Sequence, residues 1–181
     1  MQYSFQGSET NTVLTLLSDV THVKYNPIPQ FFDNVGIVED VIDGDTYDIK
    51  VLMSEIVDHE VQKCVKVIRI RLLGVDTPEL HPKVGTEEEK AIEVRAATQV
   101  KAKIVKSIKG SIVKIPQIKA DKYNGRFVAE ILVPIHKYKA ETVEIENTFI
   151  SLADWIIQNN YGVSYDGTTK KKFDPQHFNW I

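Results

Sequence analysis

The chain of 181 residues is 43% hydrophobic and 26% charged, which is the profile of a domain that can bury its own core. Its formal net charge of −3 argues against a protein that coats duplex nucleic acid through a bulk positive field, and its single cysteine, Cys64, excludes an internal disulfide framework. Basic residues still gather in four stretches: 63–71, 101–109, 114–126 and 170–172. These stretches are either a local basic face or ordinary solvated surfaces.

Composition divides the chain into an arm (1–33) rich in Ser, Thr, Asn and Pro, a domain (34–166) and a C-terminal tail (167–181). We expect the tail to be irregular and packed by Phe178 and Trp180. The chain begins without a basic leader, and its first apolar stretch is too short for a signal or membrane segment. We therefore expect an intracellular protein without a membrane span.

The domain begins with a pattern of strands. Near-alternating apolar residues predict strands over 36–42, 46–53 and 65–73, with a long connection at 54–63 between the second and the third. Gly and Pro then break regular structure, which places three polar residues on a turn just beyond the third strand. These residues are Asp76, Thr77 and Glu79.

A helix is predicted after this turn. Thr86 and Glu89 have the spacing of a capping box, and Gly110 is a natural stop after a helix that ends at about Ile108. The apolar positions of this helix recur every fourth residue and predict a face packed on the core. They are Ile92, Ala96, Val100, Ile104 and Ile108.

Two more strands, over 111–118 and 127–133, flank a turn at 121–126, and residues 150–160 predict a second helix. Residues 134–147 alternate enough to form an additional hairpin. The order of strands, helix, strands and helix predicts an α+β domain, built on a five-stranded OB-fold barrel with packed helices.

Three short runs carry the candidate chemistry: Asp43–Thr46, Arg71–Glu79 and Asp121–Arg126. They supply carboxylate oxygens for a hard cation, and their arginines, Arg71 and Arg126, have flat forks that suit a phosphate. Zinc would need His or Cys ligands, and neither residue type has the spacing of a ligand set. The implied chemistry is metal-assisted cleavage of a phosphodiester.

In order, these runs read Asp-Gly-Asp-Thr, Arg-Leu-Leu-Gly-Val-Asp-Thr-Pro-Glu and Asp-Lys-Tyr-Asn-Gly-Arg, and they resemble the staphylococcal nuclease (thermonuclease) family. The resemblance covers roughly residues 36–165, and three runs in order are far more specific than any one. It implies the OB fold and a calcium-dependent nuclease that cleaves DNA and RNA, preferably single-stranded or flexible, to 3′-phosphate products. The Asn in the third run and the ending Tyr165–Gly167 resemble phage or viral members of the family.

The resemblance also implies a metal site. Asp45, Asp76 and the backbone carbonyl of Thr77 would bind Ca²⁺, with modest affinity because so few protein ligands are charged. Glu79 would deprotonate or orient the attacking water, and both roles stay open.

Arg71 and Arg126 would bind the phosphate and gain strength as charge builds in the transition state. Arg69 lies two residues before Arg71 and projects to the same face of the strand, so it remains the alternative to Arg71. Lys122 and Tyr123 are implied contacts to a neighbouring phosphate, and Tyr165 to a base.

Each candidate also has a plainer interpretation. Asp45 alone would be a turn-capping aspartate, and Glu79 and Arg126 would be surface residues. For the whole chain, the alternative is a catalytically inactive OB-fold module that binds nucleic acid or protein, because fold does not settle function. The presence of Arg71, Glu79 and Arg126 together favours the nuclease. Its restraint by low calcium, or by an unidentified regulator bound to the arm, is a further hypothesis.

Overall fold

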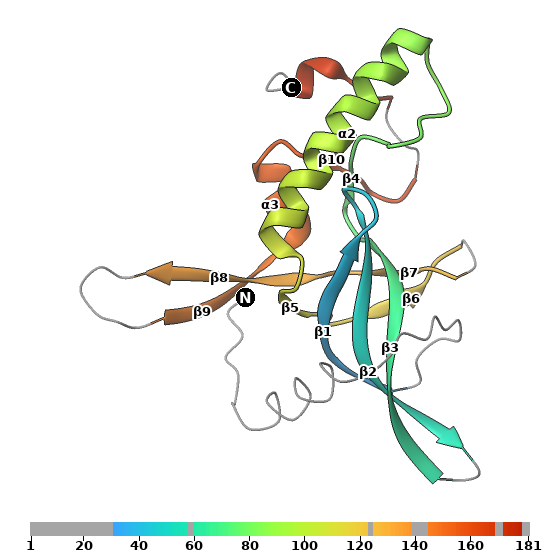
Figure 1. The fold of residues 1–181 in the computed structure, drawn as a ribbon, viewed down its shortest axis with the longest axis vertical. Coiled ribbons are helices and arrows are strands. Elements are labelled where there is room, and N and C mark those ends of the chain that lie inside the picture. Colours follow the sequence, from blue (N-terminus) through green and yellow to red (C-terminus); the bar gives the residue numbers. More distant parts are fainter. Residues whose placement is uncertain (1–30, 58–59, 123–124, 139–144, 169–171, 179–181) are drawn as a thin grey trace.

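The computed structural model describes residues 31–57, 60–122, 125–138, 145–168 and 172–178. In these ranges the chain forms a mixed α+β domain, which confirms the predicted class (Figure 1). The first strands are β1 (Phe31–Val41), β2 (Thr46–Val57), β3 (Glu60–Leu72) and β4 (Val75–Asp76). The later ones are β5 (Ile112–Lys114), β6 (Ile118–Ala120), β7 (Phe127–Ala129), β8 (Leu132–Tyr138), β9 (Ile145–Ser151) and β10 (Val163–Ser164). The helices are α2 (Glu87–Ile108), α3 (Leu152–Gln158) and the 3-10 helix η1 (Pro175–Phe178).

Strands β1, β2 and β3 form an antiparallel meander, and Figure 1 shows β2 and β3 extending together away from the body of the domain. Their pairing runs from Thr46 opposite Arg71 to Val57 opposite Glu60. The predicted long connection at 54–63 is therefore wrong for most of its length, because the two strands continue through it. The backbone N–H and C=O groups of residues 54–57 and 60–63 belong to the continued ladder between β2 and β3.

The described strands form an eight-stranded sheet in the order β6-β7-β3-β2-β1-β5-β8-β9, and a two-stranded sheet of β10 and β4. In this hydrogen-bond order the described strands are not a closed barrel. The two predicted strands over 111–118 and 127–133 are each split in two, into β5 and β6 and into β7 and β8. The first break contains Pro116, which has no N–H to donate to a ladder.

Helix α2 confirms the predicted start and end. The backbone N–H of Glu89 donates to Thr86 Oγ1 at 3.2 Å, and the backbone N–H of Thr86 donates to Glu89 Oε2 at 2.9 Å. This reciprocal pair is a capping box. Beyond the C-cap, Lys109, the chain turns at Gly110 with φ of +80°, which glycine adopts without strain.

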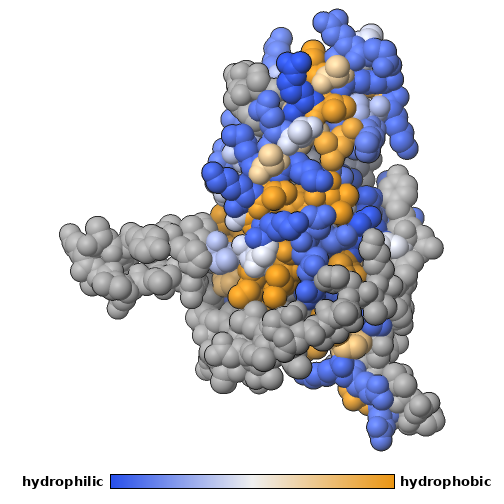
Figure 2. Space-filling view, in the orientation of Figure 1, coloured by the Kyte–Doolittle hydropathy of each residue, from blue (hydrophilic) through white to orange (hydrophobic). Residues whose placement is uncertain are grey.

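The core-facing stripe of α2 differs from the prediction at one position. Val100, Ile104 and Ile108 are buried as expected, but Ile92 is only half-buried and Glu93 lies buried instead. Figure 2 shows apolar side chains gathered between α2 and the strands beneath it. The largest fully buried side chains are Tyr47, Ile49, Ile68, Ile70, Leu72, Ile104, Ile115, Ile131, Leu152 and Ile156.

The remaining predictions concern the ends of the domain. Strands β8 and β9 pair over the predicted hairpin. In the tail, η1 lies against α2, and Phe178 is buried and stacks on Phe173 at 5.3 Å between ring centroids. Trp180, and the arm before Phe31, lie outside the described residues. None of the helices described is both long and apolar enough to cross a membrane.

Candidate active site

Asp45 lies in the tight turn between β1 and β2. The turn is closed by the backbone N–H of Ile42, which donates to the Thr46 carbonyl at 2.9 Å, and the N–H of Asp45 donates to Asp43 Oδ1 at 3.2 Å. The carbonyl of Asp45 accepts from the N–H of Leu72 at 2.8 Å, at the end of β3. This hydrogen bond fixes the position of the turn relative to the end of β3.

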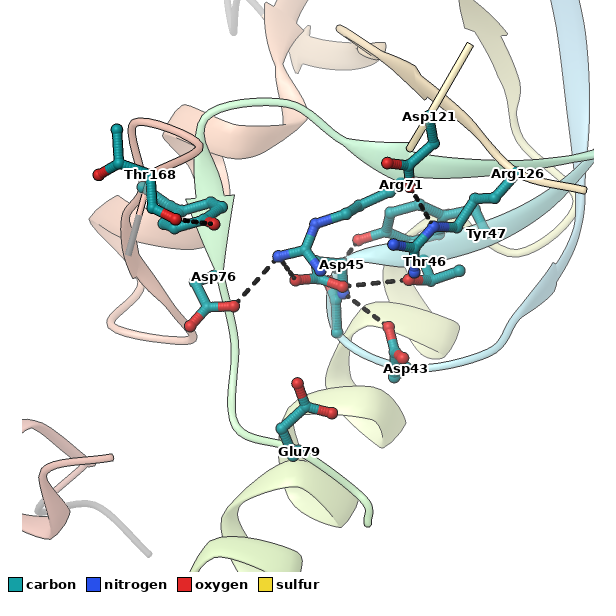
Figure 3. A network of polar contacts seen from close by, with 12 residues as sticks. Asp43, Asp45, Thr46, Tyr47, Arg71, Asp76, Glu79, Asp121, Arg126 and Thr168 are labelled. Atoms are coloured by element: carbon teal, nitrogen blue, oxygen red, sulfur yellow. Dashed lines mark hydrogen bonds and ion pairs between the residues drawn. The ribbon is translucent and has the colours of Figure 1, made fainter. Parts of the chain in front are cut away.

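Arg71 joins two carboxylates that are 31 positions apart in the sequence. Because Thr46 pairs with Arg71, the end of β3 lies directly across from the Asp45 turn. Arg71 Nη2 lies 3.0 Å from Asp45 Oδ2 and 3.1 Å from Asp76 Oδ1 (Figure 3). Asp76 is held in place by β4, where it pairs with Val163 of β10. Two of the three predicted runs therefore meet in one group.

Two buried carboxylates of this group contact the same guanidinium nitrogen. Asp45 and Asp76 are each only 5% exposed. Burial raises the pKa of Asp45 to about 7, with the charges of Asp43 and Asp76 adding to the rise and Arg71 opposing it. Burial also acts to lower the pKa of Arg71, but the charges of Asp45 and Asp76 raise it overall. One guanidinium is thus shared by two buried carboxylates, and the group can accept a further positive charge.

Glu79 follows on the segment that leaves β4. Thr77 and Pro78 are buried and Glu79 is half-buried. Figure 3 shows the Glu79 carboxylate pointing toward the space bounded by Asp45, Asp76 and Arg71. The segment is packed against the Asp45 turn, since a Cβ added at Gly44 would lie 2.5 Å from Thr77 Oγ1. All the residues proposed for metal and water thus lie around one space.

Arg126 belongs to the third run, in the turn between β6 and β7. Its Nε donates to Asp121 Oδ2 at 2.5 Å, and the backbone N–H of Asp121 donates to the Arg126 carbonyl at 3.1 Å. The following residue, Phe127, pairs with Ile70 on β3, which brings this turn beside the strand that carries Arg71. Figure 3 shows Arg126 on the side of Arg71 away from Asp76. The arrangement places both predicted guanidiniums at one end of β3.

The structure distinguishes between the two arginines of β3. Arg69 donates from Nε and Nη2 to the two carboxylate oxygens of Asp48, both at 2.8 Å. This bidentate pair engages the fork of Arg69 with its neighbour on β2. Arg71 instead contacts Asp45 and Asp76 through Nη2. Arg69 is thus paired with one residue of the neighbouring strand, whereas Arg71 contacts the two buried aspartates.

Two of the three residues predicted to contact substrate, Lys122 and Tyr165, lie in the described ranges. The Tyr165 ring lies at the site, with its centroid 5.5 Å from the guanidinium carbon of Arg71. The backbone N–H of Tyr165 donates to the Gly74 carbonyl at 3.1 Å. Lys122 is exposed on the turn that carries Arg126. Tyr123 lies outside the described residues.

The donors suit a hard cation with few protein ligands. Asp45 and Asp76 offer only oxygen, as calcium prefers, and the carbonyl of Thr77 is one residue further. Within the ranges that the structure describes, no three His, Cys, Asp or Glu side chains form a ready metal cluster. A cation held here would therefore need additional oxygens from water or substrate.

Sequence reasoning missed Glu93. Its carboxylate is only 8% exposed, and its Oε1 accepts from the backbone N–H of Glu79 at 3.1 Å. The signal for it is a charged residue three and four positions before Ala96 and Ala97, on the core-facing side of α2, where an apolar residue is usual.

Comparison with known proteins adds no relative to this picture. The chain matches no protein-family model, and it matches no curated protein. The interpretation of the site therefore depends on its own residues and their geometry.

Replacing Asp45 and Asp48 by Asn should change the free energy of unfolding in opposite directions. Without calcium at pH 8, Asp45→Asn should raise the thermal midpoint, because it removes a buried charge whose burial is unfavourable. Asp48→Asn should lower the midpoint, because it breaks the bidentate pair with Arg69. Thermal denaturation should show a change of about 1–3 kcal/mol for Asp45→Asn and of about 1 kcal/mol for Asp48→Asn.

The pH dependence of stability provides a second test of the predicted effect of Asp45→Asn. In the folded protein the pKa of Asp45 is about 7, above its ordinary 3.8, so the protonated side chain is favoured by folding. Stability from this group is present at low pH and is lost as pH rises through about 7. The gap between Asp45→Asn and the unmodified chain should therefore widen from pH 5 to pH 8. A gap that stays constant would contradict the assignment.

Proposed function

We propose that the chain is a calcium-dependent nuclease that hydrolyses phosphodiester bonds of DNA and RNA, prefers single-stranded or flexible strands, and leaves 3′-phosphate ends. The observation that carries the proposal is the contact of Arg71 with both Asp45 and Asp76, with Glu79 pointing into the same space (Figure 3). A shared set of oxygens and a guanidinium is what binding of a cation and a phosphate together requires.

The fold proposed for this nuclease is the OB barrel. Strands β5 and β6 would act as one interrupted strand, and β7 and β8 as another, paired with each other through β6–β7 and β5–β8. β1 pairs with β5, and β3 pairs in parallel with β7, so these two interrupted strands contact both edges of the meander. Counted in this way, five strands would form the ring that an OB barrel requires.

The metal proposed is Ca²⁺, held by Asp45, Asp76 and the carbonyl of Thr77. When bound, calcium would supply positive charge beside the phosphate and would help to neutralise the charge that develops in the transition state. The burial of both carboxylates and the raised pKa of Asp45 support a cation at this position.

The chain's own residues would handle the phosphate. Arg71, fixed by its ion pairs with Asp45 and Asp76, would donate to a phosphoryl oxygen. Arg126 would release Asp121 and donate to a second phosphoryl oxygen. Glu79 would accept a proton from the attacking water or hold that water in line with phosphorus. Tyr165 and Lys122 would contact the adjoining nucleotide.

The test is cleavage of end-labelled single-stranded DNA and RNA by the full chain with calcium, with magnesium, and with calcium plus excess EGTA. End-group analysis of the products then identifies the bond that is cut. Calcium-dependent cleavage to 3′-phosphate ends would support the proposal. Tight binding of the same strands without cleavage in any metal would support the alternative, a catalytically inactive OB-fold module.

A further inference from the structure

The carboxylate of Glu93 ties the segment that carries Glu79 to helix α2. Glu93 Oε1 accepts from the backbone N–H of Glu79 at 3.1 Å, and the two residues are 14 positions apart in the sequence. Glu93 is the first buried residue of α2, and the buried stripe continues through Ala96, Ala97 and Val100. The helix itself is therefore fixed by the core, and so is the acceptor that it offers to Glu79.

The segment before Glu79 has few backbone donors with which to fix itself. Strand β4, and with it the ladder to β10, ends at Asp76. Pro78 has no N–H, so the N–H of Glu79 is the first donor after Thr77. Its partner is a carboxylate, and hydrogen bonds to a charged acceptor are stronger than those between neutral groups.

A carboxylate is an unusual residue for the buried side of α2. Glu93 is 8% exposed, and burying a charge costs free energy unless the charge is well paired. An apolar residue would continue the core-facing stripe of α2 without that cost. What Glu93 supplies, and an apolar residue could not, is an acceptor for the backbone N–H of Glu79.

We propose that Glu93 is a positioning residue for the nuclease reaction: it fixes the backbone at Glu79 so that the Glu79 carboxylate faces the metal and phosphate site. The inference rests on the proposed function. Glu93 touches neither the phosphate nor the metal in this role, and it acts only through Glu79. A misplacement of about 1 Å in a catalytic group can reduce the rate by roughly 100-fold.

The test compares Glu93→Ala, which removes the acceptor, with Glu93→Gln, which keeps an amide oxygen in its place. Glu93→Ala should lower kcat by about 10–100-fold with KM changed less than about twofold, and Glu93→Gln should restore most of the rate. Glu88→Ala, at an exposed position of the same helix, is the matched control and should leave kcat unchanged. If Glu93→Ala fails to fold, Glu93→Met, which fills the space without an acceptor, replaces it.

A double-mutant cycle separates positioning from a merely structural role. If Glu93 acts through Glu79, then Glu93→Ala should cause no further loss of kcat in a Glu79→Gln background. A full additional loss there, or an unchanged kcat for both Glu93→Ala and Glu93→Met, would overturn the inference.

Hydrogen exchange at the Glu79 amide gives a readout that does not depend on activity. Exchange should be slow in the unmodified chain, faster in Glu93→Ala, and close to the unmodified rate in Glu93→Gln. Equal rates in all three would overturn the inference. An unmodified chain that cleaves no strand in any metal would overturn the proposed function and the role of Glu93 with it, whereas an active chain indifferent to Glu93 would overturn the role alone.

Discussion

Replacing Glu79 by Gln is expected to lower kcat for cleavage of single-stranded DNA by about 10²–10⁴-fold, the range typical of a group that moves or holds a proton. The amide is nearly the same size as the carboxylate, but it cannot accept a proton from water. The backbone N–H of Glu79 is unchanged, so its bond to Glu93 should persist. The measurement is kcat and KM in saturating calcium.

The matched control is Glu88→Gln, which makes the same chemical change at an exposed position on the first turn of α2. It should leave kcat within about twofold, because a single surface substitution seldom changes stability by more than about 0.5 kcal/mol. The thermal midpoint of Glu79→Gln should likewise stay within a few degrees of the unmodified chain. If Glu79→Gln kept more than half of the activity, the proposed role of Glu79 would be wrong.

The elements that sequence predicted best are those specified by local chemistry. Thr86 and Glu89 specify the start of α2 through two hydrogen bonds within one turn, and Gly110 specifies its end. The strands of the meander follow from apolar alternation, which local sequence also records. In these cases the neighbours that matter lie within a few residues in the sequence.

The parts that sequence could not predict depend on distant partners. The extension of β2 and β3 across 54–63 requires each strand to pair with the other, and the composition of either strand alone does not specify that pairing. The burial of Glu93 in place of Ile92 is set by how α2 rotates against the sheet and by the backbone of Glu79. A one-position change of the buried stripe lies within the tolerance of a helical pattern.

The candidate site shows the same division. Two of the three runs supply Asp45, Arg71 and Asp76, and the structure brings Arg71 into contact with both aspartates. The raised pKa of Asp45 could not be predicted, because it arises from burial by the whole fold. The different partners of Arg69 and Arg71 could not be predicted either, since both residues project to the same face of the strand.

That difference in partners leads to the second large effect. Arg71→Lys should reduce kcat by about 10²–10³-fold, the loss expected when one preorganised donor to a transition state is removed. Lysine keeps the positive charge between Asp45 and Asp76, so the fold and calcium binding should be largely retained. It loses the planar fork, which presents two parallel donors to a phosphoryl group.

Arg69→Lys is the control, since it is the same substitution two residues earlier on the same strand. The Arg69 side chain, which pairs with Asp48, is 38% exposed, so loss of this pair should lower stability only modestly. The kcat of Arg69→Lys should fall by less than about threefold. Steady-state kinetics and thermal denaturation of both variants in saturating calcium decide the matter. If Arg69→Lys lost the rate and Arg71→Lys kept it, then Arg69 would be the phosphate ligand. In that case its contact with Asp48 would have to open when substrate binds, as the proposed mechanism requires of Arg126 and Asp121.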